Sequence, residues 1–202
     1  MPAEAHEYEG EVQRLCGQGR HREAAEIGLR RLGPEVFGFL VGVLRSEDDA
    51  QEIFSLFAER FWSNLPGFRW DCSLRTWAYV IARNESHRFR RKEVSPRKKQ
   101  APLSEAGELA EVIRSETVSM LKTERRSKLI ELRDELDEED RALLVLRVDR
   151  GLEWQDVARA MSGAAAADLE PDELRREAAR LRKRFQLLRE RLRGLARSRG
   201  LI

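Results

Sequence analysis

Apolar side chains recur at helical spacing along most of this 202-residue chain. The clearest case lies between residues 46 and 65, where steps of three and four residues put the apolar positions on one helical face. These positions are Ala50, Ile53, Phe54, Phe57, Ala58, Phe61, Trp62 and Leu65. Ser46 and the acidic residues after it are typical of a helix start, and Pro66-Gly67 is expected to end the helix near Asn64.

The same spacing predicts helices over 21–32, 34–45 and 74–92. Gly33-Pro34 is expected to separate the first two helices, because proline cannot continue the hydrogen-bond ladder of a helix. Ser73 is the expected N-cap of the third. Its predicted inward face consists of Leu74, Trp77, Ala78, Ile81, Ala82 and Phe89. Residues 1–20 are polar and are expected to be loose.

Helical periodicity is interrupted over 93–108, where proline and glycine are typical of a linker. It returns near Leu109. Glu153–Met161 resembles the first helix of a helix-turn-helix, and a last helix is expected over 172–197. We therefore predict an all-α fold: two helical domains joined by a flexible linker, the second a helix-turn-helix domain. The predicted divisions are an N-terminal extension (1–20), a first domain (21–93), a linker (94–120) and a second domain (121–202).

Composition supports helices and adds a charge pattern, since 37% of the residues are charged but the net charge is only +2. Residues 74–100 and 171–202 each carry a net +7, whereas residues 101–140 carry −6. Two basic blocks separated by an acidic one indicate two surfaces for polyanions. The alternative is two solvated, arginine-rich helix faces.

Several function classes find no support in the residues. Cys16 and Cys72 make no disulfide framework, and with three histidines they show no metal-site spacing, so neither a metal nor a cofactor is expected. The apolar run 37–44 is too short to insert into a membrane, and the acidic N-terminus has no signal-peptide pattern, which favours a cytoplasmic protein. No catalytic grouping is recognisable, so an enzyme is not predicted.

Residues 68–92 combine aromatic and basic side chains, which suits a surface that stacks unpaired bases and holds their phosphates. Asn84 could read a base edge, since its amide both donates and accepts. By its helical spacing Trp77 favours the core, whereas Phe68 and Trp70 lie in a loop and favour function. The candidate base-stacking rings are Phe68, Trp70, Trp77 and Tyr79, and the candidate phosphate contacts are Arg69, Arg75, Arg83, Arg88, Arg90 and Arg91.

The order of residues 68–84 resembles the promoter-melting segment of bacterial extracytoplasmic-function sigma factors, F-R-x-x-S-x-R-T-W-x-Y-x-I-A-R-N. The resemblance implies that the loop at 68–71 and Asn84 hold a flipped base of the minus-ten element. We expect a minus-ten DNA-binding set of Phe68, Arg69, Trp70, Asp71, Arg75, Arg83, Asn84, His87, Arg88 and Arg91.

The preceding helix resembles the segment D-A-x-D-x-x-Q-E-x-F, with which the family binds the clamp helices of RNA polymerase. Asp49, Ala50 and Glu52 keep part of that pattern, but Ser55 and Leu56 stand where Gln and Glu are usual. The expected core polymerase contacts are Asp49, Gln51, Glu52 and Ser55. The alternative for this face is ordinary packing between helices, which suits most of its apolar positions.

The last helix carries a heptad seam and many arginines. Its apolar residues are Leu174, Ala178, Leu181, Phe185, Leu188, Leu192 and Leu195, so a coiled coil is one interpretation. Duplex DNA binding is the other, because the remaining faces are overwhelmingly basic. Arg180-Leu181-x-x-Arg184 resembles the recognition helix for the minus-thirty-five element. The expected contacts are Arg175, Arg176, Arg180, Lys183 and Arg184.

The resemblance thus implies a sigma factor that directs core RNA polymerase to promoters and melts the minus-ten element. Its expected partners are core RNA polymerase and promoter DNA, both as duplex and as melted strand, at the bacterial nucleoid. The resemblance also admits an anti-sigma factor. Two other functions stay open: a stand-alone helix-turn-helix transcription regulator, and a helical interaction protein with a coiled-coil tail.

Overall fold

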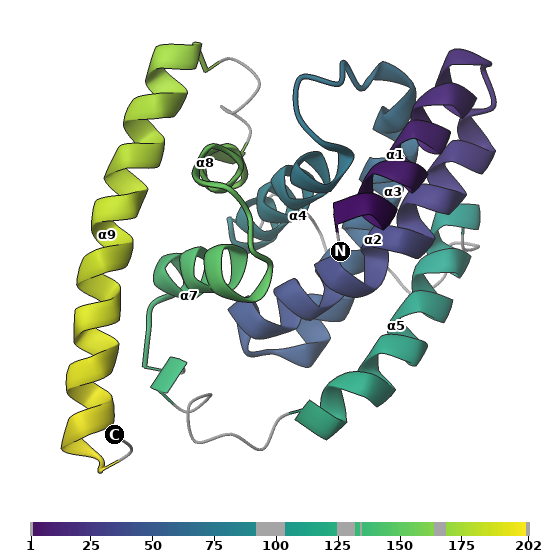
Figure 1. Cartoon of the computed structure of the whole chain (residues 1–202). Coiled ribbons are helices and arrows are strands. Elements are labelled where there is room, and N and C mark those ends of the chain that lie inside the picture. Colours follow the sequence, from purple (N-terminus) through teal and green to yellow (C-terminus); the bar gives the residue numbers. More distant parts are fainter. Residues whose placement is uncertain (1, 92–103, 125–131, 134, 164–168, 201–202) are drawn as a thin grey trace.

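The computed structural model describes residues 2–91, 104–124, 132–133, 135–163 and 169–200. Within these residues it contains eight α-helices and no β-strand, which confirms the predicted all-α fold (Figure 1). The helices are α1 (Pro2–Gly17), α2 (His21–Leu44), α3 (Glu47–Asn64), α4 (Leu74–Arg90), α5 (Glu105–Glu124), α7 (Glu138–Leu144), α8 (Trp154–Ser162) and α9 (Pro171–Ser198). A 3-10 turn, η1 (Leu65–Gly67), follows α3, and a π-helical stretch, η2 (Val145–Asp149), follows α7.

The predicted N-caps are confirmed. Ser46 accepts a hydrogen bond from the backbone N–H of Asp49 at 3.1 Å, and Ser73 accepts one from Thr76 at 3.0 Å. Each serine thereby satisfies a backbone donor that has no partner inside its own helix. Local sequence signals therefore determine where α3 and α4 begin.

The predicted break at Gly33-Pro34 is wrong, because α2 continues through Pro34. Pro34 is exposed, so the helix carbonyl that loses its donor lies on the solvent side. Buried side chains before and after the proline, among them Leu29 and Phe37, hold both halves in the same core. Burial on this scale outweighs the loss of one backbone hydrogen bond.

Residues 1–20 also differ from expectation, since α1 replaces the predicted loose segment. Its Val12 and Leu15 are buried against the core, and α1 packs on α2. The side chain of Glu9 accepts a hydrogen bond from the backbone N–H of Leu74 at 2.7 Å, at the start of α4. Two apolar side chains and one capping carboxylate are enough to order a segment whose composition is mostly polar.

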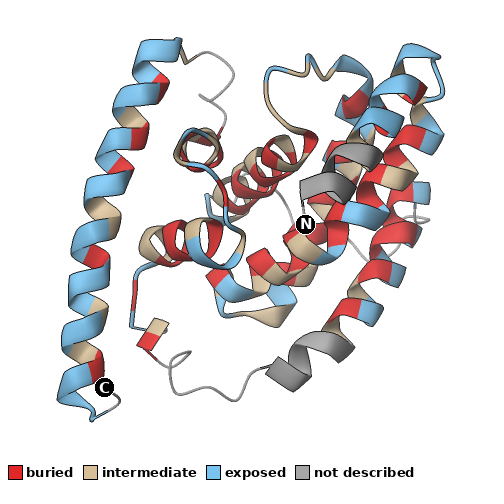
Figure 2. Ribbon diagram, viewed as in Figure 1, coloured by how far each residue is buried: buried red, intermediate tan, exposed pale blue. Residues whose placement is uncertain are grey.

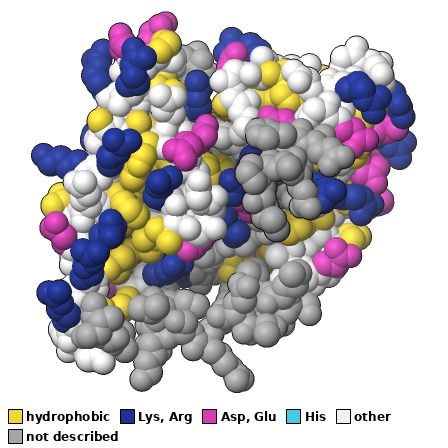
Figure 3. Space-filling view, in the orientation of Figure 1, with side chains coloured by type: hydrophobic (Ala, Val, Ile, Leu, Met, Phe, Trp, Pro, Cys, Tyr) yellow, Lys and Arg dark blue, Asp and Glu magenta, His cyan; other side chains and the backbone are white. Residues whose placement is uncertain are grey.

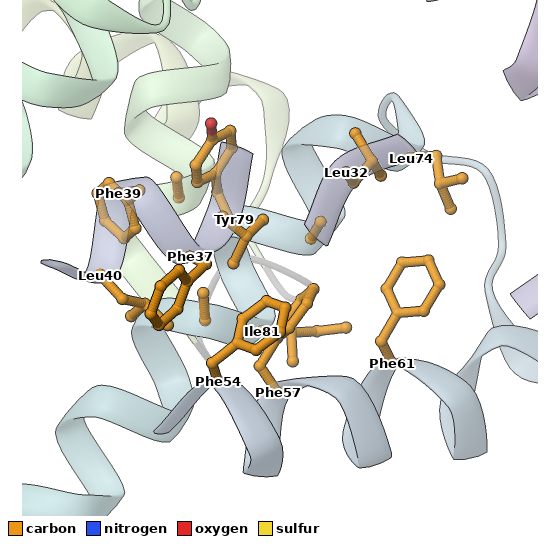
Figure 4. Close-up of a cluster of buried hydrophobic side chains, with 14 of the residues drawn as sticks. Leu32, Phe37, Phe39, Leu40, Phe54, Phe57, Phe61, Leu74, Tyr79 and Ile81 are labelled. Carbon is orange, nitrogen blue, oxygen red and sulfur yellow. The ribbon is translucent and has the colours of Figure 1, made fainter. Parts of the chain in front are cut away.

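The main core lies among α2, α3 and α4 and is rich in aromatic rings. Figure 4 shows the rings of Phe54, Phe57 and Phe61 rising from α3 toward the side chains of α2 and α4. Phe37 meets Phe54 edge-on, with ring centroids 5.3 Å apart. Edge-to-face pairs of this kind add to the stabilisation that burial of the rings provides.

Part of the predicted linker is helical, because α5 covers residues 105–120 of it and packs on α2 and α3. Leu109, Ala110 and Ile113 are buried. Residues 94–103 of that linker, and residues 125–131 and 134 beyond it, lie outside the described residues. Apolar residues of both predicted domains belong to one buried cluster, which extends from Val12 to Leu181, so the division into two domains stays a prediction.

Helices α7, α8 and α9 form the side of the molecule that lies away from α1 and α5. In Figure 1, α8 lies between α4 and α9, and α7 lies between α2 and α9. Figure 2 shows α9 with buried positions along one side and exposed positions on the other. Four of the buried positions, Leu174, Ala178, Leu181 and Leu188, belong to the predicted heptad seam, which therefore packs within the chain.

Candidate nucleic-acid interface

Three aromatic rings cluster at the loop before α4. Phe68 stacks on Trp77 with centroids 4.5 Å apart and planes 20° apart, and it contacts Trp70 at 4.8 Å. All three rings are half-buried rather than fully exposed or enclosed. Trp77 therefore has both a core contact and a contact at the loop. Its ring centroid lies 5.2 Å from that of the buried Phe61, and its other neighbour is the stacked ring of Phe68. We call Phe68, Trp70 and Trp77 the aromatic cluster.

The loop holds Trp70 in an uncommon backbone conformation, with φ of +61°. A bulky residue with positive φ is strained, and such strain persists where surrounding contacts fix the backbone, frequently at binding sites. On either side of Trp70, Arg69 and Asp71 form an exposed ion pair at 3.0 Å. In this loop the partly exposed ring of Trp70 is therefore flanked in the chain by a cation, Arg69, and an anion, Asp71.

A cleft of about 1120 Å³ opens beside the aromatic cluster. Asn84 reaches it from α4, and α8 borders it through Arg159, Ser162 and Gly163. Seven of the ten residues predicted for minus-ten binding line this cleft: Phe68, Arg69, Asp71, Asn84, His87, Arg88 and Arg91. The fold therefore brings an amide, rings and several cations into one cavity, which suits a nucleotide base with its phosphate.

Arg88 lies over a buried carboxylate. Its Nη1 donates to Glu85 Oε1 at 3.2 Å, and Arg60 of α3 donates to the same oxygen at 3.3 Å. The side chain of Glu85 is 5% exposed, whereas both arginines are more than two-fifths exposed. Glu85 therefore positions two cations at the edge of the cleft. Sequence reasoning missed both Glu85 and Arg60.

Arg75 does not face the cleft. Its Nε donates to both carboxylate oxygens of Glu35, at 2.9 and 3.1 Å, and its Nη2 donates to the carbonyl of Arg150 at 2.7 Å. Tyr79 donates to the same carboxylate at 2.6 Å, and burial, followed by the Glu35 charge, raises the pKa of its phenol. The prediction that Tyr79 offers a ring for base stacking is wrong, because the ring is fully buried.

Arg83 was expected to contact DNA phosphate, but its side chain is fully buried. Its Nη2 donates to Glu139 of α7 at 2.6 Å, and Glu138 lies 3.7 Å from its Nη1. His87 lies 3.5 Å from Glu139 as well. A hydrogen bond from His87, together with the Arg83 charge and hydrogen bond, lowers the pKa of Glu139 to about 2 despite its partial burial.

The four residues predicted to bind core polymerase lie along α3. Asp49 is exposed, whereas Gln51, Glu52 and Ser55 are half-buried. Arg114 of α5 donates to the Gln51 carbonyl at 3.3 Å and to Ser55 Oγ at 3.4 Å. Helix α5 therefore borders this face, a neighbour that periodicity within α3 could not reveal.

The basic face of α9 points to solvent. Figure 3 shows lysine and arginine side chains along the edge of the molecule that α9 forms. Of the predicted contacts, Arg175, Arg176, Arg180 and Lys183 are exposed. Arg184 differs, since its Nε donates to Asp140 of α7 at 2.6 Å. Among the residues that the structure describes, Arg175 and Arg180 pair with carboxylates one turn earlier, and their charge stays at the surface.

Trp154 joins α8 to α9. The guanidinium groups of Arg147 and Arg182 lie 5.0 and 5.5 Å from its ring, and Phe185 of α9 meets it edge-on at 5.6 Å. These cation–π contacts and the Phe185 ring hold Trp154 against both η2 and α9. Sequence reasoning did not identify this contact between α8 and α9.

In the described part of the chain, no group of histidine, cysteine and acidic side chains could hold a metal ion. Nor does any helix there combine the length and apolarity needed to cross a membrane. Cys72 lines the cleft, and burial raises the pKa of its thiol to about 11, so the thiol stays neutral at neutral pH.

A family model described as Sigma-70 region 2 matches residues 29–95. The matched segment is therefore similar to a sigma-70 region 2 domain, and it contains α2 from Leu29 onward, all of α3, the aromatic cluster and α4. Region 2 belongs to a non-enzymatic family and is the part of a sigma factor that binds core RNA polymerase and the minus-ten element. Comparisons with curated proteins and with solved structures gave no match.

Proposed function

We propose that the chain is a sigma factor of the extracytoplasmic-function type, which directs core RNA polymerase to particular promoters and melts their minus-ten element. The observation that carries the proposal is the cleft beside the aromatic cluster, lined by Asn84 and several cations. That cleft lies largely within the segment matched to region 2. The protein would act in the bacterial cytoplasm, at the nucleoid.

The aromatic cluster suits the task of holding a base that has left the duplex. Phe68 and Trp70 present partly exposed rings, and stacking on such rings is worth about 1–3 kcal/mol per base. Asn84 provides a donor and an acceptor for a base edge. Arg69, Arg88 and Arg91 border the same cleft and can contact the phosphates of the DNA backbone. Duplex binding alone would need no such pocket.

Helix α3 supports the proposed contact with core polymerase. Asp49 and Glu52 lie one helical turn apart at its start and put negative charge on a face that borders α5. We infer that Asp49, Gln51, Glu52 and Ser55 contact polymerase from this face. An anti-sigma factor would be a further partner.

Helices α8 and α9 support a second DNA contact, at the minus-thirty-five element. We infer that α9 enters the major groove, since its exposed face carries Arg175, Arg176, Arg180 and Lys183 while its apolar seam packs on α7 and α8. The inward packing of the seam also argues against a coiled-coil tail. A stand-alone regulator is the remaining alternative. Such a protein would bind duplex DNA through α9 and would not use the cleft.

The test is run-off transcription with purified core polymerase on genomic fragments. We expect discrete transcripts that require the chain, and we expect Phe68→Ala/Trp70→Ala to abolish them while core polymerase still co-purifies. Phe68→Tyr/Trp70→Tyr is the matched control, because it keeps both rings and should retain most transcription. If the alanine variant transcribes like the unaltered chain, the cleft is not the melting site. Duplex binding without polymerase binding would favour the stand-alone regulator.

A further inference from the structure

Helix α1 lies outside the segment that matches sigma-70 region 2, since the match begins at residue 29. In Figure 1 it lies beside α2, and the two helices pack on each other. Val12 and Leu15 bury one side of α1 in the core. One polar contact leads from α1 in another direction, to the start of α4 next to the aromatic cluster. Burial of α1 does not require this contact, which therefore calls for an explanation of its own.

The contact is a helix cap supplied from another helix. A carboxylate oxygen of Glu9 accepts a hydrogen bond from the backbone N–H of Leu74 at 2.7 Å. Leu74 is the first residue of α4, so its N–H has no partner within that helix. The carboxylate is also favourable there because the N-terminus of a helix carries partial positive charge. A charged acceptor makes such a hydrogen bond roughly twice as strong as a neutral one.

The residue that precedes α4 does not replace Glu9. Ser73, the N-cap, accepts a hydrogen bond from the N–H of Thr76 at 3.0 Å, and its hydroxyl lies 2.8 Å from the Thr76 hydroxyl. The first turn of α4 thus has two caps, and local sequence supplies only one of them. Without Glu9, the Leu74 N–H would lose its acceptor at a residue whose side chain is fully buried.

The aromatic cluster lies on both sides of the capped turn. Trp77 belongs to the first turn of α4, and its backbone N–H donates to the Ser73 carbonyl at 3.0 Å. Phe68 stacks on Trp77 from the loop, and Trp70 of that loop contacts Phe68. A displacement of the first turn would therefore change the spacing of all three rings. The geometry of the base-stacking surface depends on where α4 begins.

The loop needs support because its backbone is strained. Trp70 has φ of +61°, which a bulky residue keeps only where surrounding contacts hold the backbone. The Glu9 cap fixes the chain four positions later, at Leu74. The ion pair of Arg69 and Asp71 is exposed, so solvent and salt weaken it, whereas Glu9 is half-buried. The cap is therefore better suited than this surface ion pair to hold the loop.

A second residue of α1 strengthens the attachment. Tyr8 is half-buried and packs against the main core. Burial, followed by the charges of Glu9 and Glu35, raises the pKa of its phenol to about 12. The phenol therefore stays neutral at neutral pH, near the ion pair that Glu35 forms with Arg75, the second residue of α4. Helix α1 thus reaches the start of α4 through two adjacent side chains.

Glu9 acts through the loop, since it does not belong to the described residues that line the cleft. We propose that α1 is a positioning element for promoter melting: by capping α4 at Leu74, the Glu9 carboxylate holds the aromatic cluster in the conformation that receives a base. This inference rests on the proposed function. It gives a role to a helix that the match to region 2 does not include.

The test compares transcription from two templates by core polymerase with the full chain. One is a duplex promoter found by the run-off assay, and the other is the same promoter with a mismatched, already unpaired minus-ten element. We expect Glu9→Ala to lower the transcript yield on the duplex about fivefold or more, because loss of a helix cap typically costs about that factor. On the unpaired template the loss should stay below about twofold, since no base has to leave a duplex.

Glu11→Ala is the matched control, because Glu11 is an exposed residue of the same helix and the charge change is equal. It should transcribe like the unaltered chain on both templates. Glu9→Gln keeps an oxygen acceptor without the charge, so it should show the same pattern with a smaller loss of about twofold on the duplex. This variant decides the question if Glu9→Ala fails to fold.

A loss of equal size on the two templates would overturn the proposal, since a smaller fraction of folded protein affects both alike. Equal losses for Glu9→Ala and Glu11→Ala would overturn it as well, because the change in charge would then explain them. Full activity of Glu9→Ala on the duplex would remove the role of Glu9 and leave the proposed function intact. If the run-off assay yields no promoter at all, the proposed function fails and this inference fails with it.

Discussion

At the scale of single residues, Arg83 shows how a partner distant in sequence decides a side chain's environment. Helical spacing in α4 assigns Arg83 to the outer face, and the fold buries it completely. Its partners, Glu138 and Glu139, lie more than fifty positions along the chain. A positively charged side chain can be buried there because two carboxylates come with it.

Glu139 gives this contact a dependence on pH. His87 and Arg83 lower the pKa of the Glu139 carboxyl from 4.5 to about 2, so its ionised form is stabilised in the folded chain. The stabilising contribution is therefore fully present above pH 4.5 and is lost as the pH falls toward 2. We expect the urea midpoint of unfolding to fall over this range, and the fall to be smaller for Glu139→Gln. A variant whose profile matches that of the unaltered chain would contradict the assignment.

The sequence predicted much of the candidate site because the informative residues are local. Phe68, Asn84 and the cations at 87–91 lie within one loop and the helix after it, so the fold brings them together as expected. The sequence could not predict which arginines point inward, because their carboxylate partners, Glu35 and Glu139, belong to other helices. Nor could it predict Arg159 at the rim of the cleft.

At the scale of elements, helix ends were predictable and helix packing was not. Ser46 and Ser73 mark their helices with short-range hydrogen bonds that the sequence displays directly. Helix α1 and the uninterrupted α2 depend on burial against residues far along the chain. Pro34 is tolerated because it lies on an exposed face.

The packing of α5 on α2 gives an element-scale prediction at Gly33. A Cβ atom there would lie 2.9 Å from Ile113 Cδ1 and 3.3 Å from the ring of Phe54. We expect Gly33→Leu to lower the free energy of unfolding by about 1–3 kcal/mol through overpacking, as measured by urea denaturation. Adding Ile113→Ala should recover part of this stability by making room. Strictly additive effects of the two substitutions would show that α5 does not pack here.

Helix α9 gives a second prediction, on duplex DNA. Replacing Arg175, Arg176 and Arg180 by alanine should weaken binding of non-specific duplex DNA in a fluorescence titration. The slope of log affinity against log salt should become shallower by about 0.9 for each phosphate that the variant no longer neutralises. Arg191, Arg193 and Arg197, near the other end of the same helix, provide a control with an equal charge change. Equal weakening in both triple variants would mean that no particular segment of α9 contacts the duplex.

At the scale of the whole molecule, one buried cluster unites segments that the sequence assigns to separate domains. The match to region 2 ends at residue 95, yet the cluster continues to Leu181. Linker composition and periodicity describe each half and carry no information on how the halves pack. The acidic stretch between the two basic blocks was visible in the sequence, and its contacts with both became visible only in the fold.

The arrangement of tryptophans has an optical consequence. Trp70 and Trp77 lie in the aromatic cluster, whereas Trp154 lies beside Arg147 and Arg182 where α8 meets α9. A base that stacks on the first pair would quench their emission, whereas separation of α8 from α4 would change the surroundings of Trp154, which borders a cavity together with Asp71 and Cys72. The chain's own ultraviolet fluorescence can therefore distinguish occupation of the cleft from its opening, without an attached dye.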